Sequence, residues 1–154
     1  MLFTGSYEHT IDSKNRLAIP AEIRSQWRPE VDGQAWYALP WTGGQIRLYT
    51  EATFVDRSSR YSSSLTPDPD RAEMLTTLFG LARRVEMDSA GRVRLPDETL
   101  SLTGLSGEVA LVGSGEWLTV RDRAAWKASM RSRMEELQAL MVRVEQKERG
   151  PREG

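Results

Sequence analysis

Two stretches of the sequence place an aspartate and an arginine four residues apart. Residues 12–16 read DSKNR and residues 88–92 read DSAGR, so the pattern Asp-Ser-x-x-Arg occurs twice. Arginine can donate two parallel hydrogen bonds to guanine, and both arginine and lysine pair with backbone phosphates. The same spacing also allows an exposed ion pair across a tight turn, which accounts for the turn but not for the repeated cations. The side chains that we expect to contact DNA are Lys14, Arg16, Arg92 and Arg94.

Other residue types that carry chemistry in proteins are scarce in this chain. There is no cysteine, and the only histidine, His9, has no second metal ligand at a suitable spacing. The segments 104–107 and 113–115 contain glycine and serine but lack the spacing of a nucleophile elbow or a phosphate-binding loop. Asp68 and Asp70 stand beside prolines, which favours a helix cap over a catalytic pair. We therefore expect no enzyme, no metal site, no cofactor and no small-molecule substrate.

The paired motif belongs to a longer internal repeat. DSKNRLAIPAE, which begins at Asp12, recurs as DSAGRVRLPDE, which begins at Asp88, 76 residues later. Further along, YALPWTGG from Tyr37 is echoed by VALVGSGE from Val109. Self-similarity of this kind indicates two copies of one structural unit.

Each copy of the motif is predicted to form the turn of a β-hairpin. Apolar and polar side chains alternate before and after the motif, which is typical of two strands that flank a turn. Asp12 and Asp88 suit a turn that is closed by hydrogen bonds from side chain to backbone. Asn15 and Gly91 occupy the fourth turn position, and these residue types tolerate a positive φ most easily. We expect these four residues to shape the two loops.

Each copy continues with a short helix and a second pair of strands. Pro20 and Pro96 stop the preceding strand and can serve as the first helical residue. The strands that follow are predicted at 36–39 and 46–49 in the first copy and at 109–112 and 117–120 in the second. Because a lone hairpin is marginal in water, the two units must bury their faces against each other.

A helical connector and a C-terminal helix complete the predicted architecture. Asp68 is expected to cap a helix that has Pro69 in its first position. Apolar residues recur every three or four positions from Trp126 to Val144, which predicts an amphipathic helix that ends near Glu148. The fold class is α+β, mainly β. The predicted divisions are a first unit at 5–53, a helical connector at 54–81, a second unit at 82–125, and a C-terminal helix and tail at 126–154.

The charge balance leaves two classes of function open. Lys and Arg number 21 against 22 Asp and Glu, a formal charge of -1, and this total argues weakly against nucleic-acid binding. Charge is segregated, however, since residues 82–96 hold four arginines against two acidic residues. A non-DNA-binding, oligomeric protein-interaction module is the alternative, in which the C-terminal helix docks a partner and the hairpin charges only solvate the surface. No apolar run is long enough for a membrane span, so we expect no membrane partner.

The opening MLFTGSYEHTIDSKNRLAIPAEIR, the second copy EMDSAGRVRLPDE and the later GEVALVGSGEW resemble the MraZ family of bacterial transcriptional regulators, over residues 3–126. The resemblance implies two tandem SpoVT/AbrB-type swapped-hairpin units, that is, two β-barrel halves with short helices. It implies a cytoplasmic, nucleoid-associated regulator that binds double-stranded DNA at repeated short boxes. Those boxes lie in the promoter of the division and cell-wall gene cluster that contains the regulator's own gene. The resemblance also implies a ring-shaped homo-oligomer, and it carries the family's DNA-contacting arginines over to Arg16 and Arg92.

Overall fold

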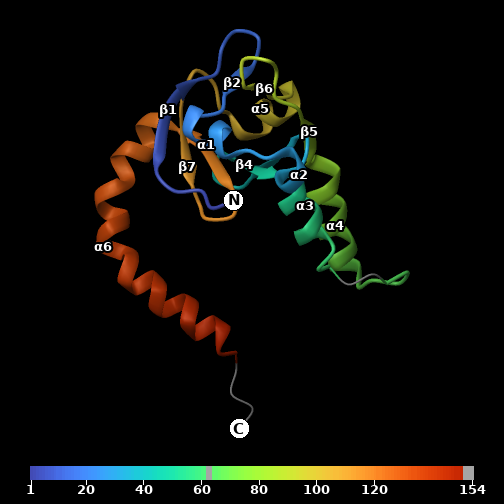
Figure 1. Ribbon diagram of the computed structural model, residues 1–154. Coiled ribbons are helices and arrows are strands. Elements are labelled where there is room, and N and C mark those ends of the chain that lie inside the picture. The colour runs from blue at the N-terminus through green and yellow to red at the C-terminus, as the bar shows by residue number, and fades with distance from the viewer. Residues whose placement is uncertain (62–63, 151–154) are drawn as a thin grey trace. The chain divides into compact units, whose positions relative to one another are not determined.

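Strands from both sequence repeats share one six-stranded sheet (Figure 1). The computed structural model describes residues 1–61 and 64–150 and contains a compact unit, Met1–Arg123, and a second unit that begins at Ala124. The first repeat supplies β1 (Ser6–Thr10), β2 (Arg16–Ala18), β3 (Trp36–Trp41) and β4 (Gln45–Thr50). The second repeat supplies β5 (Arg83–Val85), β6 (Arg92–Arg94), β7 (Glu108–Gly113) and β8 (Leu118–Asp122). The strands predicted for the second half of each repeat are confirmed, and they pair as β3 with β4 and β7 with β8.

The first strand of each repeat is exchanged onto the other repeat. The six-stranded antiparallel sheet has the order β1-β7-β8-β4-β3-β5, so β1 pairs with β7 of the second repeat and β5 with β3 of the first. The remaining strands, β2 and β6, pair with each other in a separate two-stranded ribbon. Among the described residues, antiparallel pairing across a turn is limited to an isolated bridge between Met87 and Val93, so the prediction of two full hairpins was wrong, and the strands around each turn pair across the repeats.

The α+β class, with mainly strands, is confirmed. The sheet is open, with β1 and β5 at its two edges, and it does not close into the barrel halves that the resemblance implied.

Short helices connect the strands of the first unit. They are α1 (Ala21–Gln26), α2 (Pro29–Asp32), α3 (Glu51–Ser58), α4 (Pro69–Leu81) and α5 (Asp97–Thr103). Pro20 and Pro96 lie at the N-cap and not in the first turn, because their ψ angles of 138° and 145° are extended. Asp68 caps α4 as predicted, since its side chain accepts a hydrogen bond of 3.2 Å from the backbone amide of Arg71.

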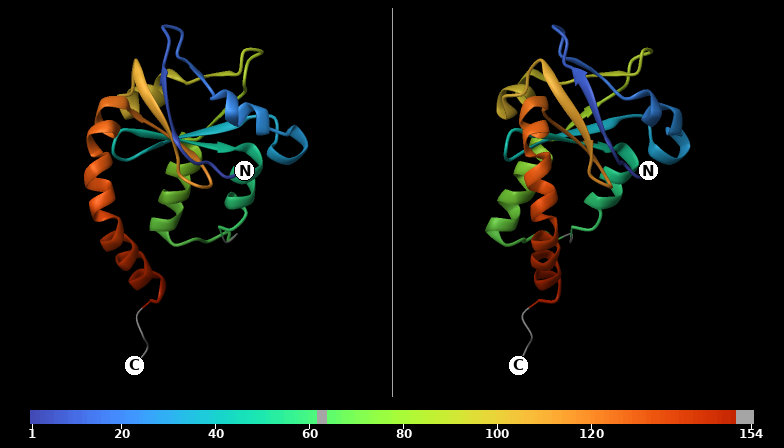
Figure 2. Two further views of the ribbon diagram at one scale, coloured as in Figure 1. Left: turned by 60° about the vertical axis from the view of Figure 1, so that its left-hand side comes forward. Right: turned by 90° about the vertical axis from the view of Figure 1, so that its left-hand side faces the viewer.

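The β2–β6 ribbon packs on the core of the first unit. Leu17 and Val93, at the centre of the ribbon, are completely buried and belong to the same apolar cluster as Trp36, Leu48 and other sheet residues. Burial of these two side chains fixes the ribbon against the sheet. The loops that precede β2 and β6 project from the same end of the unit, as Figure 2 shows in two views.

The second unit is one long helix followed by the end of the chain. Helix α6 (Arg123–Glu148) confirms the predicted C-terminal helix and ends at the predicted residue. None of its residues is buried. Residues 151–154 of the predicted tail lie outside the described residues. In the part of the chain that the structure describes, no helix has the length and apolar character needed to cross a membrane.

Candidate nucleic-acid interface

The first Asp-x-x-x-Arg loop is closed by its own aspartate. One carboxylate oxygen of Asp12 accepts hydrogen bonds from the backbone amides of Lys14 and Arg16, both at 2.9 Å. The other oxygen accepts a hydrogen bond of 2.7 Å from Nε of Arg16. Asn15 has a φ of 62°, which confirms the predicted left-handed residue at the fourth turn position. The Asp12 carboxylate therefore both closes the turn and orients the Arg16 side chain.

The second loop repeats this network atom for atom. Asp88 accepts from the backbone amides of Ala90 at 2.9 Å and Arg92 at 3.0 Å, and from Nε of Arg92 at 3.0 Å. Gly91 has a φ of 76°, again as predicted. Two sequences that differ at two of their five positions therefore hold their arginines in the same way.

Both aspartates are held in the ionised form. The backbone amide of Arg16, followed by its side chain, lowers the pKa of Asp12 below the ordinary value, and the amide and side chain of Arg92 do the same for the pKa of Asp88. The acceptor network of each loop is therefore complete at neutral pH. Within residues 1–61 and 64–150, each guanidinium is bound only through Nε, so its two terminal nitrogens keep their hydrogen-bond donors for a ligand.

The ribbon brings the cations of the two repeats together on one face. Arg16 lies opposite Arg94, and Ala18 lies opposite Arg92, on either side of the central Leu17–Val93 pair. Successive side chains of a strand point to opposite faces, so the burial of the central pair directs all three arginines outward. The outer face of the β2–β6 ribbon thus carries Arg16, Arg92 and Arg94.

The cations are distributed unequally along the ribbon. Lys14 and Arg16 belong to the first loop, and the antiparallel register places Arg94 of the other repeat at this same end. Arg92 is at the opposite end. The sequence shows that Lys14 has Ala90 as its counterpart and that Arg94 has Ala18, but only the register shows that both extra cations gather at the first loop.

Each loop is also held by a hydrogen bond to a residue of the opposite repeat, and these residues were not predicted from the sequence. Asn15 donates a hydrogen bond of 2.5 Å from Nδ2 to Asp97, which lies at the start of α5 in the second repeat. Arg24 of α1 reaches across to the second loop, with its Nη1 3.5 Å from the carbonyl oxygen of Ala90. A Cβ at Gly91 would lie 2.2 Å from the Arg24 side chain, so close approach as well as the positive φ favours glycine there. No local sequence signal marks these contacts between residues about 66 to 82 positions apart.

Neighbouring arginines are paired with acidic residues, as Arg16 and Arg92 are with their own loop aspartates, whereas Lys14 and Arg94 are not paired among the described residues. Arg83 pairs with Glu98 at 2.9 Å, and Arg84 pairs with Glu51 and Glu86, both at 2.7 Å. Across residues 1–61 and 64–150, the structure gives the side chains of Lys14 and Arg94 no hydrogen bond or ion pair. Lys14 of the first loop and Arg94 of the ribbon are therefore available to an anionic ligand.

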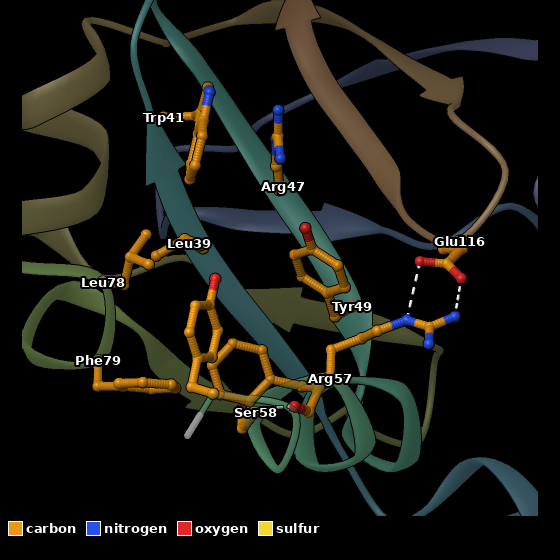
Figure 3. A pocket seen from close by; sticks show the side chains of 11 residues that line it. Leu39, Trp41, Arg47, Tyr49, Arg57, Ser58, Leu78, Phe79 and Glu116 are labelled. Carbon is orange, nitrogen blue, oxygen red and sulfur yellow. Dashed lines mark hydrogen bonds and ion pairs between the residues drawn. The ribbon is translucent and has the colours of Figure 1, made fainter. Parts of the chain in front are cut away.

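An aromatic pocket of about 220 Å³ lies beside α3 and α4 (Figure 3). Tyr49, Phe54 and Phe79 form part of its wall, and Arg57 is paired with Glu116 at its rim. The hydroxyl of Ser58 donates a hydrogen bond of 2.6 Å to the carbonyl oxygen of Phe54. The pocket holds no histidine or cysteine, and the described residues contain no cluster of three or more His, Asp or Glu side chains suited to a metal ion. It offers apolar contact surface and no activated nucleophile.

The sequence of this chain is similar to those of known proteins of one family. The family model described as "MraZ protein, putative antitoxin-like" matches residues 78–143. A transcriptional regulator MraZ from Thermomicrobium roseum (strain ATCC 27502 / DSM 5159 / P-2) is 33% identical over 130 residues, which cover 82% of this chain and 86% of that protein. The chain belongs to the MraZ family.

Two further relatives with the name transcriptional regulator MraZ show the same extent of similarity. The protein from Koribacter versatilis (strain Ellin345) is 28% identical over 131 residues, 85% of this chain and 89% of the relative. The protein from Caulobacter vibrioides (strain NA1000 / CB15N) is 29% identical over 128 residues, 82% of this chain and 81% of the relative. All three relatives are named as transcriptional regulators.

Proposed function

We propose that this MraZ-family chain is a DNA-binding transcriptional regulator that presents the outer face of its β2–β6 ribbon to the major groove. The major groove of B-DNA admits a two-stranded β-ribbon. The observation that carries the proposal is the alignment of Arg16, Arg92 and Arg94 on the face of the ribbon that points away from the core. The naming of the relatives as transcriptional regulators supports the same function.

The two kinds of cation have different roles in this proposal. The aspartates orient Arg16 and Arg92 through Nε. The two terminal nitrogens of each arginine then donate a pair of hydrogen bonds to O6 and N7 of a guanine. Lys14 and Arg94 contact backbone phosphates, because both are exposed and without an acidic partner among the described residues. Asp12, Asn15, Asp88 and Gly91 keep the loops in shape.

The finer biological assignment follows the family resemblance. The regulator acts in the cytoplasm, associated with the nucleoid, on repeated short boxes in the promoter of the division and cell-wall gene cluster that includes its own gene. The two similar but non-identical repeats, at 5–53 and 82–125, provide a head-to-tail contact that closes copies of the chain into a ring. Loops that bind weakly one by one then gain affinity when the spacing of the boxes matches the spacing of the loops.

A titration of the full chain with DNA tests this function. Fluorescence anisotropy would compare the fragment upstream of the protein's own gene with a fragment of equal length and composition but shuffled sequence. We expect about 10³-fold tighter binding to the upstream fragment or more. If Lys14 and Arg94 each neutralise one phosphate, raising the salt from 50 to 200 mM weakens binding by about 12-fold per engaged protomer. Equal affinity for the two fragments, or affinity that does not change with salt, would overturn the proposal.

A further inference from the structure

The aromatic pocket beside α3 and α4 contains a positive charge that the proposed DNA contacts do not use. Among the described residues that line the pocket, the charged ones are Arg47, Arg57 and Glu116. Arg57 and Glu116 pair with each other, so the net charge of the pocket wall is that of Arg47. An anionic ligand would therefore be preferred over a neutral or cationic one of the same shape.

Arg47 is held in place by stacking and not by hydrogen bonds. Its guanidinium carbon lies 3.9 Å from the ring centroid of Trp41 and 4.5 Å from that of Trp117. Its Nε is buried without a hydrogen-bond partner, and within residues 1–61 and 64–150 the structure gives the side chain no ion pair. Because buried polar atoms in proteins are nearly always paired, this guanidinium needs an explanation beyond packing.

The stacking leaves the hydrogen-bond donors of Arg47 usable. Aromatic rings contact the faces of a guanidinium, whereas its N–H groups lie in its plane. A carboxylate that approaches in this plane can accept two of them in parallel. The two tryptophans thus fix the direction from which an acid would be bound.

A second polar group lies at the same end of the pocket. Figure 3 shows the hydroxyl of Tyr49 pointing toward the end at which Arg47 and Trp41 lie, and Phe79 of α4 at the other end. The Tyr49 ring contacts the ring of Phe54, and its hydroxyl makes no hydrogen bond to another described residue. The pocket is therefore polar at one end and aromatic elsewhere.

The volume limits the size of the ligand. About 220 Å³ is the space of about seven water molecules, and it is smaller than the pockets of about 300–1,000 Å³ that hold drug-sized ligands. A nucleotide or a folded peptide is too large for this space, whereas one aromatic ring with one acidic group fits.

We propose that this pocket binds a small aromatic carboxylic acid, with the carboxylate on Arg47 and the Tyr49 hydroxyl and the ring against Phe54 and Phe79. The acid is a ligand and not a substrate, because the pocket offers no activated nucleophile. The site shares no residue with the ribbon, so it does not depend on the proposed DNA binding.

Phenylacetate is the probe, and phenylacetamide is its neutral counterpart of the same shape. The full chain would be labelled with 5-fluorotryptophan, which gives one fluorine NMR signal for each of its five tryptophans. Trp41→Phe and Trp117→Phe assign the two signals beside Arg47. We expect phenylacetate to shift both signals saturably with a Kd of about 1 mM. Phenylacetamide at the same concentrations should reach less than about a tenth of saturation, because it lacks the charge that Arg47 pairs with.

Three variants test the residues that hold the acid. Arg47→Met keeps an apolar stem between the two indoles and should weaken phenylacetate binding to the level of the amide. Tyr49→Phe removes only a hydroxyl, so it should remain folded and weaken binding about three- to tenfold. Arg131→Met is the matched control, since it removes the same charge from α6, outside the pocket, and should bind phenylacetate like the wild type.

Three results would overturn the inference. One is equal affinity for the acid and the amide, and another is wild-type affinity in a folded Arg47→Met or in Tyr49→Phe. The third is no saturable shift at about 10 mM phenylacetate, which includes the case of a neighbouring copy that covers the pocket. Arg16→Ala should bind phenylacetate like the wild type while it loses DNA affinity, so failure of this site and failure of the proposed DNA function are separate observations.

Discussion

Replacement of Arg16 separates base contact from charge and from stability. Its guanidinium is bound to Asp12 only through Nε, and its side chain is 30% exposed, so the terminal nitrogens are available to guanine. Loss of one bidentate guanine contact costs about 1–3 kcal/mol, which corresponds to about 5- to 150-fold in affinity for each engaged protomer. Loss of an exposed ion pair lowers stability by at most about 1 kcal/mol. Arg16→Ala should therefore weaken DNA binding far more than it lowers the melting temperature.

Arg16→Lys gives the sharper comparison, because lysine keeps the positive charge but lacks the planar fork. We expect Arg16→Lys to lose most of the affinity that Arg16→Ala loses, while retaining the salt dependence of the wild type. Anisotropy on the upstream fragment measures the affinity, and thermal unfolding followed by tryptophan fluorescence measures the stability. Arg60→Ala is the matched control, since it removes an exposed arginine in the turn after α3 that pairs with Asp56. Wild-type affinity for Arg16→Ala together with a lowered melting temperature would show that Arg16 serves the fold and not DNA recognition.

Three other variants probe the phosphate contacts, the ribbon and the sheet edge. Lys14→Ala should reduce the slope of log affinity against log salt by about 1 for each engaged protomer, and an unchanged slope would mean that Lys14 does not touch the DNA backbone. Leu17→Ala should lower the free energy of unfolding in urea by about 2–5 kcal/mol, because Leu17 is completely buried, and a loss below about 1 kcal/mol would contradict the packing of the ribbon on the core. Burial, and secondarily the charge of Arg123, lowers the pKa of His9 below 6.5. As the pH falls through 6.5, His9 is therefore protonated in the unfolded chain before it is protonated in the folded chain, and the free energy of unfolding decreases. The urea midpoint should therefore drop between pH 7.5 and 5.5 in the wild type and drop less in His9→Gln, and equal drops would exclude this role of His9.

Local features of the loops could be predicted because their causes are local. An aspartate at the first turn position and Asn15 or Gly91 at the fourth specify a turn through hydrogen bonds within five residues. Asp68 before Pro69 specified the start of α4 for the same reason.

The pairing of strands and the bracing of the loops could not be predicted in this way. Alternation of apolar and polar residues shows which side of a strand is buried, but it does not identify the neighbouring strand. Both β2 and its copy β6 satisfy the pattern of a hairpin strand, and they pair with each other because their central side chains close the core together. The contacts of Asn15 with Asp97 and of Arg24 with the second loop depend on that exchange and appear only in the folded chain.

Binding of the upstream DNA by the double variant Arg16→Ala, Arg92→Ala tests the role of the ribbon most directly. Both arginines are half-exposed and their removal leaves the buried centre of the ribbon intact, so the variant should remain folded. If each arginine makes one guanine contact, the affinity should fall by about 30-fold or more for each engaged protomer, toward the affinity for shuffled DNA. A folded double variant that binds the upstream fragment as tightly as the wild type would contradict the assignment of the two loops to DNA recognition.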